Sequence, residues 1–379
     1  MTAEPGILLM VVAFLLVIGP LIFVHELGHY LAGRLFGVKA ESFSIGMGRE
    51  VAGWTDRRGT RWKLSALPIG GYVKFAGDMG PASEPDPAWL RLSPEERART
   101  LQGRPVWQRF LIVAAGPITN FLVAIAIFAA FFAIWGVVRT PPVVASVVAG
   151  SGAERADIRI GDRVTSVGGR SVSTFEDVID FMHIRMGGTF AVGIERAGRP
   201  MTVTVTAQTV AYRDELGHPA KRAVLGLYPG QSERVRGPVV VLSEATAHTF
   251  RIVRTMIDVL GQIATGQRSA KELGGPLKIA QVSGEVASLG PLPFVELMAL
   301  ISINLGFINL LPIPLLDGGH LLFYVIEGVR RRPLPARAQE WAFRSGLALL
   351  LGFMLFVTVN DLGSFGLWDK LAGLIRQAG

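Results

Sequence analysis

The stretch FVHELGHYLA, residues 23–32, places three ionisable side chains at the end of an apolar run that is long enough to cross a lipid bilayer. The run GILLMVVAFLLVIGPLIFV leads without a charge into His25, Glu26 and His29. A charged side chain at mid-membrane costs about 2.5 to 3.5 kcal/mol on insertion scales. An interaction that needs these side chains must therefore offset this cost.

The composition is typical of a polytopic membrane protein. Of the 379 residues, 50% are hydrophobic and only 18% are charged, which is too apolar for an ordinary soluble domain. Most of the net charge of +8 follows the first apolar run or lies in the cluster Arg330, Arg331 and Arg332. This placement fits cytoplasmic loops and argues against a nucleic-acid partner. The lack of cysteine excludes disulfides and thiolate ligands.

Four segments have the length of about 20 apolar residues that a spanning helix needs. They cover residues 6 to 36, 109 to 138, 293 to 327 and 340 to 360. Arg34 and Lys39 follow the first run and no basic residue precedes it, which predicts an uncleaved first span that runs inward. Residues 238 to 264 carry five polar ionisable side chains, so we expect an amphipathic helix on the outer surface. A fifth span there would turn the arginine cluster outward.

These segments predict four consecutive units, and the predicted fold class is an α-helical polytopic membrane protein with four transmembrane helices. Residues 1–140 hold the first two spans and a basic loop whose alternating residues predict a small membrane-associated β-sheet at 43 to 75. Residues 141–230 begin with two prolines and carry strand patterns, which predict an α+β domain outside the membrane. Residues 231–292 are the amphipathic segment, and residues 293–379 contain the last two spans.

HELGH is an HExxH motif. Histidines four residues apart lie on one helical face and can both bind one zinc ion, while Glu26 can act on zinc-activated water. In a soluble helix such a match is often incidental. Inside an apolar span the interpretation is stronger, because unpaired polar groups there cost free energy and mark functional sites.

A catalytic zinc needs a third protein ligand. Glu41 and Glu50 are candidates, but both fall in the loop beyond the span. Asp317 interrupts the apolar stretch ISINLGFINLLPIPLLDGGHLLF and, like His25, lies about 20 residues into an inward-running span, so both are expected at similar depth. Two alternatives stay open: Asp317 could be a turn residue, because Asp-Gly-Gly is also turn chemistry, and His320 could be the ligand.

With HELGH in the first span and NLLPIPLLDGGH in a later one, the chain resembles the site-2 protease family of intramembrane zinc metalloproteases, specifically the bacterial regulator-of-sigma-E protease type. The stretches AAGPITN and GGPLKIA also match. The stretch GSGAERADIRIGDRVTSVGGRSV resembles a PDZ domain, so the α+β domain at 141–230 is expected to be PDZ-like; many relatives carry two such domains, and this chain has room for one.

The resemblance implies roles for six residues. His25, His29 and Asp317 would bind Zn2+ and Glu26 would be the general base. Asn309 and Asn304 match positions that hold the substrate backbone in relatives, although for Asn304 we favour a hydrogen bond between spans.

The resemblance also implies the activity and its setting. The protein would be a zinc-dependent endopeptidase that cuts single-span membrane proteins, such as anti-sigma factors or signal-peptide remnants, within or near their transmembrane segment. It would lie in the lipid bilayer of the bacterial inner membrane, with a periplasmic PDZ-like domain and an active site open to the cytoplasm. An upstream site-1 protease would act on the same substrate. The alternative is an inactive scaffold that binds transmembrane helices.

Overall fold

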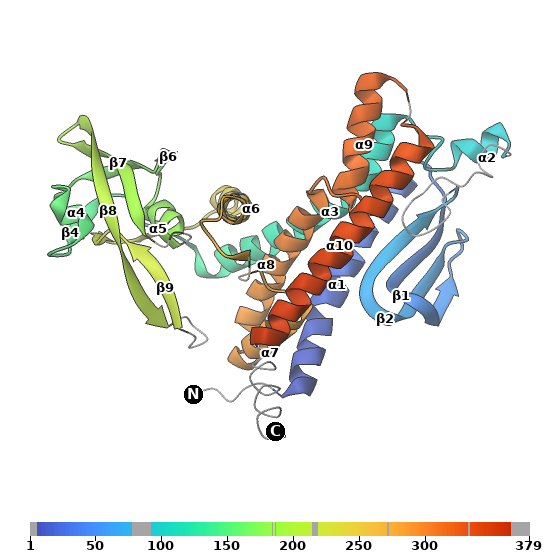
Figure 1. The fold of residues 1–379 in the computed structure, drawn as a ribbon, viewed down its shortest axis with the longest axis horizontal. Helices are drawn as coiled ribbons and strands as arrows, with labels where there is room; N and C mark the ends of the chain where they lie inside the picture. The colour runs from blue at the N-terminus through green and yellow to red at the C-terminus, as the bar shows by residue number, and fades with distance from the viewer. Residues whose placement is uncertain are drawn as a thin grey trace, which may run out of the picture. The chain divides into compact units, whose positions relative to one another are not determined.

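The computed structural model describes residues 6–77, 92–183, 185, 187–213, 219–270, 273–332 and 334–364. The chain divides into two compact units (Figure 1). We call residues 128–268 the β-rich unit and the residues before and after them the helical unit. The end of the last predicted segment, 365–379, lies outside the described residues.

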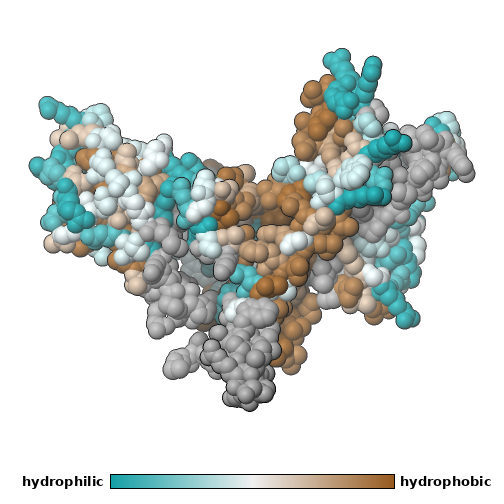
Figure 2. All heavy atoms as spheres, in the orientation of Figure 1, coloured by the Kyte–Doolittle hydropathy of each residue, from teal (hydrophilic) through white to brown (hydrophobic). Residues whose placement is uncertain are grey.

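The helical unit is built on four helices that are long and apolar enough to cross a membrane. Its helices are α1 (Ile7–Leu35), α2 (Pro94–Ala98), α3 (Val106–Trp135, which continues into the β-rich unit), α7 (Pro276–Leu289), α8 (Pro291–Leu310), α9 (Asp317–Arg330) and α10 (Ala336–Ser364). The four candidate spans are α1, α3, α8 and most of α10. The 20 residues of α8 extend about 30 Å, the thickness of the hydrocarbon layer. The prediction of four spans is confirmed in this sense, and Figure 2 shows hydrophobic residues gathered over these helices.

The third predicted span, 293 to 327, is two helices and not one. Helix α8 ends before a loop with two prolines, and α9 begins at Asp317. In the loop the Leu316 N–H donates to the carbonyl of Ile313 (3.1 Å), and Leu315 between them has a φ of 82°. Proline at the second position and a positive φ at the third are typical of a type II turn. The prediction of one continuous span was wrong, because proline cannot continue the helix, and the break presents Asp317 at a helix start.

The predicted small sheet is a hairpin of two long antiparallel strands, β1 (Ala40–Thr55) and β2 (Arg61–Phe75), with an irregular register. Its turn is closed by Asp56, whose carboxylate accepts hydrogen bonds from the backbone of Arg58 and Thr60 and from the Trp62 indole. The Trp62 bond is the main reason why the pKa of Asp56 is lowered. Aromatic residues of both strands pack on α1 around Tyr30, which fixes the hairpin beside the HELGH segment.

The β-rich unit contains a five-stranded antiparallel sheet of order β6-β5-β7-β8-β9 and two short strand pairs. Its elements are β3 (Val137–Arg139), β4 (Val144–Val147), α4 (Gly152–Arg155), β5 (Arg163–Val167), β6 (Arg170–Ser171), α5 (Phe175–His183), β7 (Gly188–Arg196), β8 (Arg199–Arg213), β9 (Pro219–Val224), β10 (Leu227–Pro229), β11 (Glu233–Val235) and α6 (Pro238–Ala264). The apolar core lies between the sheet and α5. The composition is α+β, as expected. Strands β3 and β11 pair with each other just outside the predicted limits of 141 and 230.

Helix α6 spans the residues predicted for the amphipathic helix, and it is not among the four apolar helices of the described chain. Ion pairs join it to the sheet domain: Arg170 with Asp258, and Arg251 with Asp180 at 3.6 Å. On the other side, the His248 ring packs edge-on against Phe128 and Phe132 of α3. The predicted segment 231–292 is divided, because α6 belongs to the β-rich unit and α7 to the helical unit.

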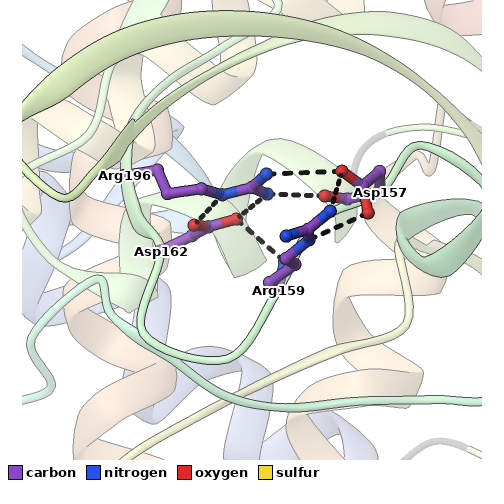
Figure 3. A network of polar contacts seen from close by, with 4 residues as sticks. All are labelled: Asp157, Arg159, Asp162 and Arg196. Carbon is purple, nitrogen blue, oxygen red and sulfur yellow. Dashed lines mark hydrogen bonds and ion pairs between the residues drawn. The ribbon is translucent and has the colours of Figure 1, made fainter.

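The corner before β5 is closed by four charged residues (Figure 3). Arg196 donates two hydrogen bonds to the carboxylate of buried Asp162, at 2.8 and 2.7 Å, and the backbone N–H of Arg159 donates a third at 2.8 Å. The exposed Asp157 pairs with Arg159 and Arg196. The Arg196 hydrogen bonds are the main reason why the pKa of Asp162 is lowered. The network therefore holds the chain where it enters the sheet.

Candidate active site

The HELGH segment lies in the last three turns of α1, and its three ionisable side chains are buried. His25 and His29 share one face of the helix, with their Nε2 atoms 3.2 Å apart. The Asp317 Oδ2 atom lies 3.1 Å from His25 Nε2 and 3.4 Å from His29 Nε2. The structure thus brings the three predicted ligands together from distant parts of the chain. Among the described residues, they form a group that could hold a metal ion.

The donor atoms fit a zinc ion. The Nδ1 atom of His29 is 3.0 Å from the carbonyl oxygen of Ile112, to which it can only donate, so a neutral ring has a free electron pair on Nε2. That electron pair faces Asp317 Oδ2, a buried atom that receives no hydrogen bond. Two histidine nitrogens and one carboxylate oxygen are a ligand set that catalytic zinc sites use. No proton bridges His29 Nε2 and Asp317 Oδ2, so a cation between them would give both atoms a partner.

One face of α3 supports the predicted ligands, and its residues are not among the predicted site residues. The carbonyl of Ile112 bonds His29, and a Cβ added at Gly116 would collide with the His29 ring. Asn120, which is fully buried, places its side-chain amide 3.2 Å from His25 Nδ1. These residues are four apart, so they share a helical face. The AAGPITN stretch was the available signal, because a glycine and an asparagine at this spacing are unusual inside an apolar span.

Close packing of glycines explains the Asp-Gly-Gly sequence. A Cβ at Gly318 would collide with the backbone of Leu311, and a Cβ at Gly319 would collide with the backbone of Ile313. The turn itself precedes Asp317, which is the first residue of α9. Asp317 is therefore not a residue of the turn, and the two glycines let α9 start directly against the loop.

The rival ligands lie elsewhere. Glu41 pairs with Lys74 at 3.1 Å, and Glu50 pairs with Arg61 in the hairpin. The His320 ring packs 5.4 Å from the ring of Phe343 in α10. None of the three belongs to the group of metal-binding residues.

Glu26 and the two asparagines occupy different surroundings. Glu26 is buried and faces β2, where a Cβ at Gly71 would lie 3.0 Å from Glu26 Cγ. Asn309, half-buried at the end of α8, donates to the carbonyl of Leu305 at 3.0 Å. Asn304 is half-buried in the middle of the same helix. Glu26 adjoins His25 in sequence and precedes His29 by three residues, while contact of the asparagines with substrate stays a prediction.

Comparisons with known proteins agree with this geometry. Residues 13–353 match the family described as Peptidase family M50. A relative from Agrobacterium fabrum, whose name describes it as a zinc metalloprotease, is 45% identical over 360 residues, which cover 93% of this chain and 96% of the relative. Metalloprotease MmpA of Caulobacter vibrioides is 36% identical over 394 residues, which cover 97% and 99%.

Among solved structures, the PDZ domain of the SdrC-like protein from Listeria monocytogenes matches 23% of this chain and 84% of its own, with 19% identity and a TM-score of 0.18. The match to the family extends over most of the described helices and includes both parts of the metal-binding group. The chain is therefore a membrane-embedded zinc metalloprotease that belongs to peptidase family M50, the site-2 protease family.

Proposed function

We propose that the protein is an intramembrane endopeptidase that cuts single-span membrane proteins within or near their transmembrane segment, with zinc held by His25, His29 and Asp317. One observation carries this proposal. His25 and His29 lie within α1, which is long and apolar enough to span the bilayer, and Asp317 meets them there from the start of α9. A peptide bond can reach them only if the substrate enters the membrane-embedded part of the protein.

The residues around the ligands supply the remaining chemistry. When bound, zinc would provide the Lewis acidity that activates water and polarises a carbonyl group. Glu26, adjacent in sequence to His25 and one turn before His29, accepts the proton of the water and passes it to the leaving amine. The bond from His29 to the carbonyl of Ile112 fixes the ring and its tautomer.

The substrate must expose its backbone before it is cut, because a helical segment has its carbonyl groups hydrogen-bonded internally. Strand β2 passes Glu26 at Gly71, so an unwound substrate can recover hydrogen bonds by adding a strand to the hairpin. Asn309, next to the loop that precedes Asp317, holds the substrate backbone. Asn304 serves in packing between spans.

We further propose an orientation in the bacterial inner membrane. Arg34 at the end of α1, Arg104 before α3 and the arginine cluster after α9 lie at the same end of the helical unit, as the bond from Arg104 to the carbonyl of Gly37 shows for the first two. The positive-inside rule makes this the cytoplasmic end. The PDZ-like domain is then periplasmic, and substrates such as anti-sigma factors or signal-peptide remnants reach the site after an upstream protease trims them.

The PDZ-like domain offers a specific surface for a trimmed substrate. An apolar cavity of about 430 Å³ lies between α5 and the segment of β9 and β10. Its lining includes Phe175, Val178, Met182, Leu225 and Leu227. An extended peptide with an apolar C-terminus fits such a groove by strand addition, whereas a domain that only excludes bulky proteins does not need it.

The decisive experiment is cleavage of a model single-span substrate by the purified full chain in detergent. Wild type should cut, and Glu26→Gln should abolish cutting while zinc content stays the same. A zinc chelator should also abolish it. Glu296→Gln is the matched control, because Glu296 is exposed on another spanning helix. If wild type retains zinc but cuts no substrate, the scaffold alternative gains support.

A further inference from the structure

A groove lies between the first turns of α3 and the last turns of α9, both within the helical unit. It has a volume of about 510 Å³ and is lined by Val106, Trp107, Phe110, Leu111, Tyr324, Val325 and Gly328. The walls are almost wholly apolar and open outward from the two helices. The groove is separate from the metal ligands, which lie near the other end of α9, so the proteolytic site does not account for it.

The groove lies at the depth of the membrane surface. Its residues are the first of the span α3, and on α9 they come directly before the arginine cluster Arg330, Arg331 and Arg332. Trp107 is 57% exposed, and tryptophan is enriched at the level of lipid headgroups. Figure 2 shows hydrophilic residues at the tip of α9, directly above hydrophobic ones.

Among the described residues, the arginine cluster at the rim has no acidic partner, unlike the neighbouring Arg109. Arg109, beside the groove, is neutralised by Glu327 at 2.6 Å and lies over the Tyr324 ring. In the described part of the chain no ion pair involves the three exposed residues of the arginine cluster, although ion pairs lie nearby in Arg109–Glu327 and Arg344–Glu340. Arg330 is the last residue of α9, and Arg331 and Arg332 follow it directly, so the cluster stands at the end of the helix that forms one wall of the groove.

We propose that this groove binds an anionic phospholipid, with an acyl chain between α3 and α9 and the phosphate held by the arginine cluster. The apolar walls match the chain, and unpaired arginines at headgroup depth match the phosphate. A soluble anion would contact the arginines but not the apolar groove, and a neutral lipid would fill the groove but leave the arginines without a negatively charged partner. Binding is measured directly, so this proposal stands apart from the proteolytic function.

The test uses the purified full chain in detergent, with equal amounts of phosphatidylglycerol and phosphatidylcholine that carry the same acyl chains. Native mass spectrometry counts the lipid retained. Wild type should retain phosphatidylglycerol about 10-fold more than phosphatidylcholine. The triple variant Arg330→Gln, Arg331→Gln and Arg332→Gln should bring this ratio close to one.

Two further variants serve as comparisons. The first tests binding of the acyl chain separately from the headgroup, and the second tests whether charge removed elsewhere has the same effect. Gly328→Leu should reduce retention of both lipids, and the helix has room for the new side chain because nothing lies within 4 Å of its Cβ position. The control triple Arg49→Gln, Arg57→Gln and Arg58→Gln removes the same charge from exposed positions of the hairpin and should keep the preference.

Three outcomes would overturn the proposal. They are equal retention of the two lipids by wild type, an unchanged preference in the arginine variant, and displacement of the lipid by inorganic phosphate alone. Zinc content, measured on each variant, shows that the helical unit is folded, so that lost binding is not mistaken for unfolding.

Discussion

Two buried polar clusters among the described residues, one in each unit, satisfy their charges in opposite ways. At the corner of the β-rich unit, Asp162 accepts three hydrogen bonds, and protein groups alone complete the network (Figure 3). In the helical unit, His25, His29 and Asp317 converge within 3.4 Å, and Asp317 Oδ2 receives no hydrogen bond. The first cluster is complete without a ligand, whereas the second needs a cation.

This difference predicts that the two clusters fail differently when they are changed. Without a cation, the electron-rich atoms of His25, His29 and Asp317 repel one another. They keep their positions only if the surrounding backbone is packed closely enough to hold them together. Changes in the packing around the metal ligands should therefore release zinc and leave the protein folded. Changes in the corner network should lower the free energy of unfolding and leave zinc bound.

The largest effect is expected for Gly116→Ala. The new methyl group would collide with the His29 ring, at a place where α1 and α3 pack so closely that a Cβ at Gly28 would also collide with the backbone of Ala115. We expect zinc affinity to fall roughly 100-fold, the upper range for changes next to metal ligands. Competition with a chromophoric chelator measures it. Gly352→Ala in α10, where nothing lies within 4 Å, is the control, and wild-type affinity in Gly116→Ala would refute the packing argument.

A smaller loss, about 10-fold in zinc affinity, is expected for Asn120→Leu. The substitution keeps the volume but removes the amide beside His25 Nδ1. A zinc-bound His25 must donate from Nδ1. The Asn120 amide can accept that bond after a half-turn, which would also give its buried oxygen, now without a hydrogen-bond partner, a donor. Asn120→Asp keeps an acceptor and should retain zinc. Equal losses in both variants would show that Asn120 acts only through packing.

The ligands themselves were predictable from sequence, because their chemistry is carried by side chains that are conspicuous in an apolar span. HELGH and Asp317 were found in this way, and the structure places Asp317 beside His25, as the depth argument expected, while their role as zinc ligands stays a prediction. The support from α3 was not predictable to the same degree. The carbonyl of Ile112 is a backbone group with no sequence signature, and Gly116 matters only because of where the facing helix lies.

The fold, too, was only partly predictable from the sequence. Hydropathy located the four spanning helices, but it continued the third span through the loop before Asp317, because leucine and isoleucine there are as apolar as the helix. The prolines were the correct signal for the break. The irregular register of the hairpin was not predictable in this way, because it arises from the pairing of β1 with β2, and pairing is a property of two segments.

In the corner network, Asp162→Asn should lower the free energy of unfolding of the β-rich unit by about 2 kcal/mol at neutral pH. The pKa of Asp162 is lowered in the folded protein, mainly by the Arg196 hydrogen bonds. The ionised carboxylate thus stabilises the fold above its unfolded pKa of about 3.9, and this stability is lost as the pH falls through the lower folded value. Hydrogen exchange of the sheet measures it. The difference between wild type and variant should shrink below about pH 4, with zinc unchanged at neutral pH.

The smallest effect is expected for Asp157→Asn in the same network. Asp157 is exposed and pairs with Arg159 at 3.0 Å in solvent, so its contribution is screened by salt, unlike that of buried Asp162. Asparagine also tolerates the positive φ of 58° at this position. The loss measured by hydrogen exchange should be smaller than for Asp162→Asn and should vanish near about 1 M salt, where the Debye length is about 3 Å. A loss that persists in salt would mean that the network is held from its rim and not from its buried carboxylate.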